Sequence, residues 1–273
     1  MEPTATFATI IQDKNVYLSF VCHHALYDGV AMERMLYEVE QHFSGSPLPP
    51  VTSSYEQFLH QSLTLPASTD DFWLEHLADY EPKLITNLNS NLAETRISRL
   101  ISRTDVPLSL VNSRARELGI SLLALAQSAW AITLGSLFGT GDICFGNVIN
   151  GRSLPIEGIS ELVAPCFNTI PVRMDLTQRQ RNIDLMKTFQ SANTQFMQYQ
   201  FTPIRHIQSL FSQKGIQRLF DTLLLLQQPP RDLDQSLWTL ERDEGEMDVS
   251  WHPNHQEEVG ATANKTRSLL YVK

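Results

Sequence analysis

The 273-residue sequence predicts an α/β fold with enough material for a large folded core. Apolar residues make up 42% of the chain and charged residues 19%, a balance that is typical of folded proteins and not of disordered ones. Segments with the two-residue period of a strand alternate with segments that have helical spacing. The change of period is clearest at Gly29, where an alternating apolar run gives way to a helical pattern.

Two strands are predicted at the start of the chain, over 7–11 and 16–22, and a polar turn joins them. In the second strand the even positions are apolar and therefore share one face. Continuing this alternation past Cys22 predicts that His24 points inward with the apolar set and that His23 points to the other side.

Helices are predicted for the next stretch. One begins near Gly29 and ends at the Ser-Gly pair 44–45, which prolines follow. A second, over 68–80, has Ser or Thr in the capping position and acidic residues in its first turn. The polar stretch 81–95 is the predicted crossing between two lobes.

The second half of the chain alternates in the same way. A strand is predicted near 96–102, followed by a helix over 108–118 that Gly119 ends. The segment 118–141 carries no charge, and its length raises the question of a transmembrane helix. Its Ser121 cap and its small polar residues favour a buried core helix instead.

The remaining elements continue this order. Strands are predicted over 142–150 and 167–176, where apolar and polar residues alternate. A long amphipathic helix covers about 185–199, and the Thr-Pro pair 202–203 is placed as the cap and first residue of another helix. The apolar run 220–227 is predicted to be a buried strand.

Charge and cysteine content narrow the classes of function. The net charge of −9 and the pI near 5.3 argue against a nucleic-acid-binding protein. The three cysteines, Cys22, Cys144 and Cys166, are odd in number and lie in apolar surroundings, so we predict a reducing compartment, the cytoplasm. Histidines and glutamates at 252–258 have a spacing that is weak for metal ligands, and we predict no metal site.

The segment VCHHALYDGV, residues 21–30, resembles the His-His-x-x-x-Asp-Gly signature of nonribosomal peptide synthetase condensation domains, including its place between a strand and a helix. Three further stretches are similar to this family: DICFGNVINGR, which ends in a Gly-Arg turn, the segment FNTIPVR, and the helix DFWLEHLADY. The stretches APCFNTIPVR, FTPIRHIQ and FDTLLLLQ are most similar to the fungal branch, which includes siderophore synthetases. The resemblance covers about residues 5–228.

The resemblance implies a chloramphenicol-acetyltransferase-like α/β sandwich, in which two lobes form a V around a channel. Because the family signature lies well inside the first lobe, we expect the chain to lack the N-terminal part of that lobe, and the C-terminal end of the domain as well. It would then be a fragment, the product of an aberrant gene prediction, or a decayed copy. The predicted division is 1–95 for the remainder of the N-terminal lobe, 96–251 for the C-terminal lobe and 252–273 for a divergent tail.

The two histidines are the first candidate catalytic residues. Amide formation from a thioester needs removal of a proton from the amine, and histidine suits this task because its ordinary pKa lies near neutral pH. The resemblance assigns the catalytic role to His24, whereas His23 is expected to hold the loop. The alternative is that His24 is an ordinary core histidine at the end of a strand.

The Asp-Gly pair and a later segment complete the candidate site. The Asp28 carboxylate suits a helix cap, and the resemblance makes it a structural anion that we expect to pair with Arg173. The Gly29 amide could face the thioester oxygen, or this glycine could serve only the turn. Asn168 and Thr169 are expected to shape the tunnel.

The function that the resemblance implies is formation of amide or ester bonds between acyl or aminoacyl thioesters, in secondary-metabolite or siderophore biosynthesis. The implied partners are donor and acceptor carrier-protein domains and the adenylation domains of the same synthetase. The phosphopantetheine arms belong to the carrier proteins, so we predict no cofactor bound by this chain, and neither nucleic acid nor membrane as a partner. Two alternatives stay open: a catalytically inactive remnant or docking scaffold, and a coenzyme-A-dependent acyltransferase of the same superfamily.

Overall fold

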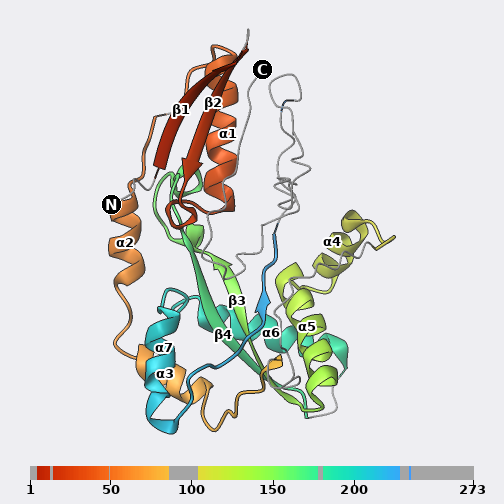
Figure 1. The fold of residues 1–273 in the computed structure, drawn as a ribbon. Helices are drawn as coiled ribbons and strands as arrows, with labels where there is room; N and C mark the ends of the chain where they lie inside the picture. The colour runs from red at the N-terminus through yellow and green to blue at the C-terminus, as the bar shows by residue number, and fades with distance from the viewer. Residues whose placement is uncertain are drawn as a thin grey trace. The chain divides into compact units, whose positions relative to one another are not determined.

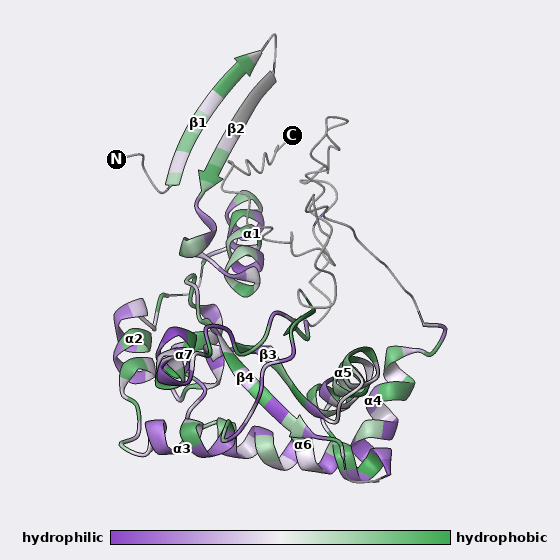
Figure 2. Cartoon of the chain, turned by 60° about the horizontal axis from the view of Figure 1, so that its bottom comes forward, coloured by the Kyte–Doolittle hydropathy of each residue, from purple (hydrophilic) through white to green (hydrophobic). Residues whose placement is uncertain are grey.

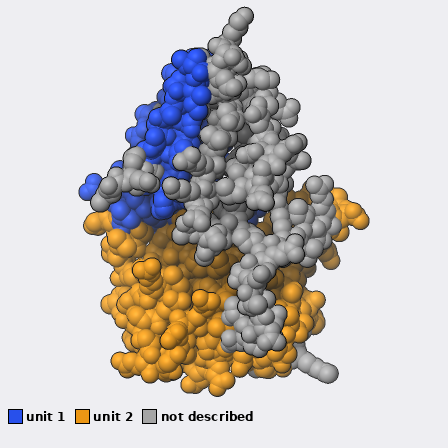
Figure 3. Space-filling view, in the orientation of Figure 1, with its two compact units in different colours: residues 1–59, 152–166, 227–273 blue, residues 60–151, 167–226 orange. Residues whose placement is uncertain are grey.

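The structure is a computed structural model that describes residues 5–12, 15–48, 50–85, 104–177, 181–227 and 234. The chain divides into two compact units, which are coloured separately in Figure 3. The first unit comprises residues 1–59, 152–166 and 227–273, and the second comprises 60–151 and 167–226. The predicted domain boundaries at 95 and 251 lie outside the described residues, so that division stays a prediction.

The first unit begins with a two-stranded antiparallel sheet (Figure 1). Strand β1 (Ala5–Gln12) pairs with β2 (Asn15–Cys22) along its whole length. At one pair of opposite positions the rings of Phe7 and Phe20 stack with their centroids 4.7 Å apart. Both predicted strands are confirmed, each slightly longer than expected.

A short 3₁₀ turn and a helix follow the hairpin. The turn η1 covers His24–Leu26, and helix α1 covers Gly29–Phe43, as its apolar spacing predicts. Because β2 ends at Cys22, the strand alternation does not reach the second histidine. The predicted inward orientation of His24 is therefore wrong, and its side chain is exposed in the part of the chain that the structure describes. The physical reason is the turn, which redirects the side chains that follow the strand.

The second unit is centred on a three-stranded sheet with the order β4-β3-β5 (Figure 1). Strands β3 (Asp142–Asn150) and β4 (Phe167–Asp175) pair antiparallel along their whole length. Both predicted strands are therefore confirmed. Figure 2 shows the alternation of hydrophobic and hydrophilic residues along β4. Every second side chain of β4 from Ile170 onward, including Val172, is buried.

Strand β5 (Leu223–Leu224) differs from the prediction. It pairs parallel with β3 over only two residues, and Leu223 is 59% exposed. The predicted buried strand over 220–227 is therefore wrong in length and in burial. The reason is that an apolar run fits a buried strand and an edge segment equally well, and among the described residues β5 has only β3 as a neighbour.

Helices supply the rest of the second unit. They are α3 (Thr69–His76), α4 (Leu108–Glu117), α5 (Leu122–Phe138), α6 (Asn182–Phe196) and α7 (Ile204–Leu210), and each corresponds to a predicted helix. One more helix, α2 (Tyr55–Leu63), was not predicted. The core between these helices and the sheet contains Trp73, Leu134, Phe145, Val172 and Phe189, all less than 2% exposed. The predicted strand over 96–102 lies outside the described residues.

The ends of the helices follow local chemistry in most cases. The Ser121 hydroxyl accepts the Ala124 amide at 3.1 Å and caps α5, and Gly119 has a φ of +67° just after α4. The predicted Thr202 cap is wrong, because α7 begins after Pro203 and makes no side-chain cap bond. The Thr202 hydroxyl instead accepts from Trp73 Nε1 at 3.0 Å.

The charge-free segment forms α5, with Ala124, Gln127, Ala131 and Leu134 buried along one side. The prediction of a core helix is therefore confirmed. Within the described ranges, no single helix has both the length and the apolar character that a membrane crossing needs. Helices α4 and α5 meet these criteria only when taken together, and they are bent by 99° at the break between them.

Candidate active site

His23 holds the turn that carries the histidine pair. It lies just after β2, with extended backbone angles, and its ring Nδ1 accepts the Ala25 amide at 3.1 Å. This bond caps η1 in the way that an Asn or Ser side chain caps a helix. The His23 ring is thus engaged with its own loop, which agrees with the structural role expected for it.

His24 is exposed and lies flat against a neighbouring ring. Its imidazole stacks on the Tyr27 ring with centroids 4.6 Å apart and 6° between the planes. Its Nδ1 atom lies 3.3 Å from the Tyr27 carbonyl oxygen. Among the described residues, no hydrogen bond engages the other ring nitrogen, Nε2. The ring is therefore oriented by one residue and has one nitrogen available for a substrate.

The Asp28 carboxylate is buried and fully engaged. Its Oδ1 atom accepts the Ala31 amide at 2.8 Å, so it caps α1 as predicted. Its Oδ2 atom accepts from Arg152 Nη1 at 2.6 Å and from the Cys166 amide at 2.9 Å. Asp28 is thus both a helix cap and a structural anion. The expected pairing with Arg173 is wrong, because the partner is Arg152.

Arg152 was not predicted as a site residue. Its Nη2 atom donates to the carbonyl oxygens of Leu162 and Ala164, each at 3.0 Å. The side chains of Arg152 and Asp28 are only 6% and 10% exposed. The guanidinium therefore joins the turn after the histidines to the segment 152–166. The signal for this role was present in the sequence, because Arg152 ends the Gly-Arg turn of DICFGNVINGR.

Two further contacts hold the segment 152–166 in the first unit. Arg34 of α1 forms an ion pair with Glu161. The Ser53 hydroxyl donates to the Gly158 carbonyl at 3.0 Å. Gly158 has a φ of +72°, and a Cβ atom at this position would collide with the Thr52 side chain. The segment is thus fixed at three separate points.

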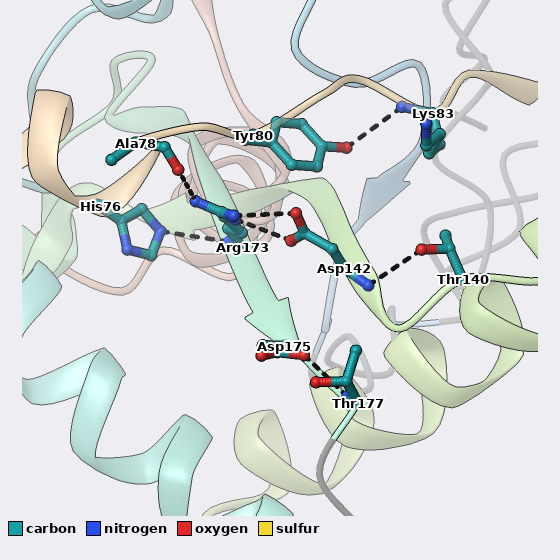
Figure 4. Close-up of polar contacts among 9 residues, drawn as sticks. All are labelled: His76, Ala78, Tyr80, Lys83, Thr140, Asp142, Arg173, Asp175 and Thr177. Carbon is teal, nitrogen blue, oxygen red and sulfur yellow. Dashed lines mark hydrogen bonds and ion pairs between the residues drawn. The ribbon is translucent and has the colours of Figure 1, made fainter.

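Arg173 belongs to a different cluster, in the second unit (Figure 4). Its Nε and Nη2 atoms donate to the two Asp142 carboxylate oxygens at 2.8 and 2.9 Å, and Nη1 donates to the Ala78 carbonyl. The guanidinium also lies over the Tyr80 ring, 5.4 Å from its centroid. The strand register explains this choice of partner. Asp142 lies diagonally across from Arg173 on the same face of the β3-β4 pair.

His76 completes this cluster from the C-terminal end of α3 (Figure 4). Its Nε2 atom accepts the Arg173 backbone amide at 3.2 Å. Burial, and to a smaller extent the Arg173 charge, lower the pKa of His76 to about 4. Hydrogen bonds to Asp142 raise the pKa of Arg173. The cluster therefore joins a neutral imidazole to a permanent ion pair and fastens the chain after α3 to the sheet.

The other predicted site residues lie on β4 and α1. Asn168 Nδ2 donates to the carbonyl oxygens of Gln200 and Thr202 at 2.8 and 3.0 Å, so it ties β4 to the segment before α7. Thr169 is partly buried, and Gly29 is the first residue of α1. The roles predicted for these residues in a tunnel and at the thioester oxygen stay predictions.

No metal centre is present within the described ranges, where no three His, Cys, Asp or Glu side chains come together. The residues at 252–258 lie outside these ranges. A groove of about 460 Å³ lies in the second unit, and His76 is part of its wall. The residues that line it are Phe72, Glu75, His76, Gln195, Gln198 and Tyr199. None of the predicted site residues belongs to this groove.

Comparison with protein families gives a match over most of the chain. The family model described as "Condensation domain" matches residues 3–260. The chain is 46% identical over 248 residues to "Nonribosomal peptide synthetase 2" of Gibberella zeae, and 39% identical over 247 residues to "Nonribosomal peptide synthetase SIDC" of Beauveria bassiana. Each alignment covers 90% of this chain and 5% of the relative, so the chain spans a small part of these curated proteins.

Solved structures share the fold. The cyclization-docking bidomain of the EpoB synthetase from Sorangium cellulosum matches with a TM-score of 0.65 and 16% identity, over 82% of this chain and 48% of that one. The first condensation domain of the CDA synthetase matches with a TM-score of 0.58 and 14% identity, over 85% and 54%. The predicted chloramphenicol-acetyltransferase-like two-lobed α/β fold is thereby confirmed.

Proposed function

Since this chain belongs to the condensation-domain family, we propose that it forms amide or ester bonds between acyl or aminoacyl thioesters held on carrier proteins. The related synthetases from fungi support a role in secondary-metabolite or siderophore biosynthesis. The partners in this proposal are a donor and an acceptor carrier-protein domain and the adenylation domains of the same synthetase.

One observation supports the choice of His24 as the proton acceptor. In the turn formed by the family signature, the His23 ring and the Asp28 carboxylate are held by hydrogen bonds within the protein, whereas the His24 imidazole is exposed. Asp28 accepts hydrogen bonds from Arg152 and from two amides, so both of its carboxylate oxygens are used in structural contacts and the proposal gives it no part in proton transfer. His24 keeps Nε2 available among the described residues and is the proton acceptor in this proposal.

The reaction follows from the chemistry of a thioester and an amine. The amine nitrogen attacks the carbonyl carbon, and the carbon–sulfur bond breaks as the amide forms. The proton that leaves the nitrogen passes to His24 Nε2 and then to the departing pantetheine thiolate. The Gly29 amide, in the first turn of α1, is the proposed donor to the developing oxyanion. Holding two tethered reactants together supplies most of the rate, because it replaces an encounter in solution.

The proposal places no resident cofactor on this chain, since the phosphopantetheine arms arrive on the carrier proteins. It also places the chain in the cytoplasm. The three free cysteines support this location, because a reducing compartment keeps thiols unpaired.

The proposal is tested with a donor and an acceptor carrier protein, each loaded with an aminoacyl group. The expected result is a dipeptidyl group on the acceptor arm, detected by mass spectrometry, with no product when the chain is omitted. The control supplies the same donor group on coenzyme A and is expected to give little transfer. Equal transfer from coenzyme A would favour the acyltransferase alternative, and no transfer from either donor would favour an inactive remnant or docking scaffold.

A further inference from the structure

Tyr27 makes two different contacts with the candidate catalytic imidazole. Its ring lies parallel to the His24 ring, with 6° between the planes and 4.6 Å between the centroids. Its backbone carbonyl lies 3.3 Å from His24 Nδ1. Tyr27 thus contacts the His24 ring twice. Its side chain packs on the face of the ring, and its carbonyl oxygen lies at the edge.

These contacts restrict the imidazole in two ways. Stacking opposes rotation of the ring, which an exposed histidine would otherwise undergo between rotamers. The carbonyl oxygen can only accept a hydrogen bond, so it favours the tautomer with a proton on Nδ1. In that tautomer the lone pair is on Nε2, and the fixed plane decides the direction in which it points.

Tyr27 directly precedes the residue that forms the buried ion pair. It follows η1 with extended backbone angles, and its amide donates to the His24 carbonyl at 3.4 Å. The next residue is Asp28, which Arg152 and the Cys166 amide fix in place. The contact chain therefore runs from Arg152 through Asp28 and Tyr27 to the imidazole.

We propose that Tyr27 is a positioning residue for His24: its ring fixes the plane of the imidazole and its carbonyl fixes the tautomer that presents Nε2 to the amine. This inference rests on the function proposed above for His24. Tyr27 touches no reacting atom, so it acts only through the histidine. The inference gives it no part in binding either carrier protein, so its removal should lower kcat and leave KM unchanged.

Kinetics with the two loaded carriers test the positioning role. The full chain with Tyr27→Leu is expected to lose about tenfold in kcat, the size of one aromatic stacking contact, with KM for the acceptor carrier unchanged. Tyr27→Phe keeps the ring and is expected to keep at least half of the turnover. Leu26→Ala changes an exposed neighbour in the same turn and serves as the matched control, with turnover equal to that of the unmodified chain.

A spectroscopic arm tests the geometry without any turnover. In the full chain with ¹⁵N-labelled histidine, at alkaline pH where imidazoles are neutral, His24 is expected to carry its proton on Nδ1. Its ring protons are expected to resonate upfield because of the Tyr27 ring, and to move downfield in Tyr27→Leu. Mixed tautomers or unshifted protons in the unmodified chain would overturn the inference, even if the variants failed to fold.

The two arms separate this inference from the proposed function. Turnover that depends on His24 but is the same in Tyr27→Leu would overturn the positioning role alone. Turnover that does not change in His24→Ala would overturn the proposed function and this inference together.

Discussion

At the scale of single residues, the buried pair of Asp28 and Arg152 decides whether the histidine turn keeps its shape. Two charges that are 6% and 10% exposed cannot be rescued by water if one of them is removed. Asp28 satisfies three donors at once, namely the Arg152 guanidinium and the amides of Ala31 and Cys166. The carboxylate therefore stabilises α1, the turn and the segment 152–166 together.

We predict that Asp28→Ala lowers the free energy of unfolding by about 3–5 kcal/mol, because it removes the counter-charge of a buried guanidinium. Urea denaturation monitored by tryptophan fluorescence measures this change. The matched control is Arg114→Ala, which breaks an ion pair whose side chains are 69% and 61% exposed, and it is expected to cost under about 1 kcal/mol. Equal costs for the two variants would contradict the structural role of Asp28.

His76 gives the stability a dependence on pH. Its pKa is about 4 in the folded chain, below the ordinary histidine value of 6.5, so the unfolded chain binds more protons between these pH values. Stability is therefore fully present above pH 6.5 and is lost as the pH falls toward 4. The contribution of His76 is at most about 3 kcal/mol.

The measurement compares the unmodified chain with His76→Gln, in which the amide oxygen can still accept the Arg173 amide. Subtracting the two profiles of unfolding free energy against pH removes the contribution of the carboxylates. The difference is expected to grow between pH 4 and 6.5 and to stay constant at higher pH. A difference that does not change with pH would show that folding does not lower the pKa of His76.

At the scale of elements, the path of the segment 152–166 depends on one glycine. Gly158 has a φ of +72°, and a Cβ atom would also collide with Thr52. Gly45, in the same unit, has the same φ of +72° but no atom within 4 Å of a Cβ position. The two glycines therefore differ in the collision and not in the backbone angle.

We predict that Gly45→Ala costs about 1–2 kcal/mol of stability, the ordinary penalty of the left-handed region. Gly158→Ala is expected to cost at least about 1 kcal/mol more, because the collision with Thr52 adds strain. Thermal unfolding followed by circular dichroism compares the two variants. Matching losses would mean that the contact between 158 and Thr52 does not constrain the segment.

Sequence patterns predicted most elements because their causes are local. The Ser121 cap and the change of period after Gly29 lie within a few residues of the helices they begin. The orientation predicted for His24 is wrong because the alternation of the strand ends at its last residue, Cys22. The length of β5 could not be predicted, since it depends on which chain segment lies beside it.

The pairing of charges shows the same division between local and distant causes. The cap formed by Asp28 involves Ala31, three residues away, whereas its ion pair involves Arg152, 124 residues away. Periodicity and capping patterns act over a few residues and do not choose between Arg152 and Arg173, so the Gly-Arg turn that Arg152 ends was the available signal. The Asp142–Arg173 pair follows from the strand register. Both residues lie on predicted strands, and they share a face once the register is known.

At the scale of the whole molecule, each compact unit combines segments from distant parts of the sequence. The segment 152–166 belongs to the first unit, and 60–85 belongs to the second. A division of the chain into an N-terminal and a C-terminal part would place each of these segments in the other unit. The histidine turn therefore depends on residues contributed from both halves of the chain. We predict that this turn, and His24 in particular, is the reaction centre.

The most direct test is the rate of condensation between two loaded carriers for His24→Ala and His23→Ala, each compared with the unmodified chain. We predict that His24→Ala lowers the rate about 10²–10⁴-fold, the usual contribution of a general base. His23→Ala is expected to retain more activity, because this ring caps the turn and transfers no proton. Condensation that proceeds at the same rate without the His24 imidazole would contradict the role of His24 as the proton acceptor.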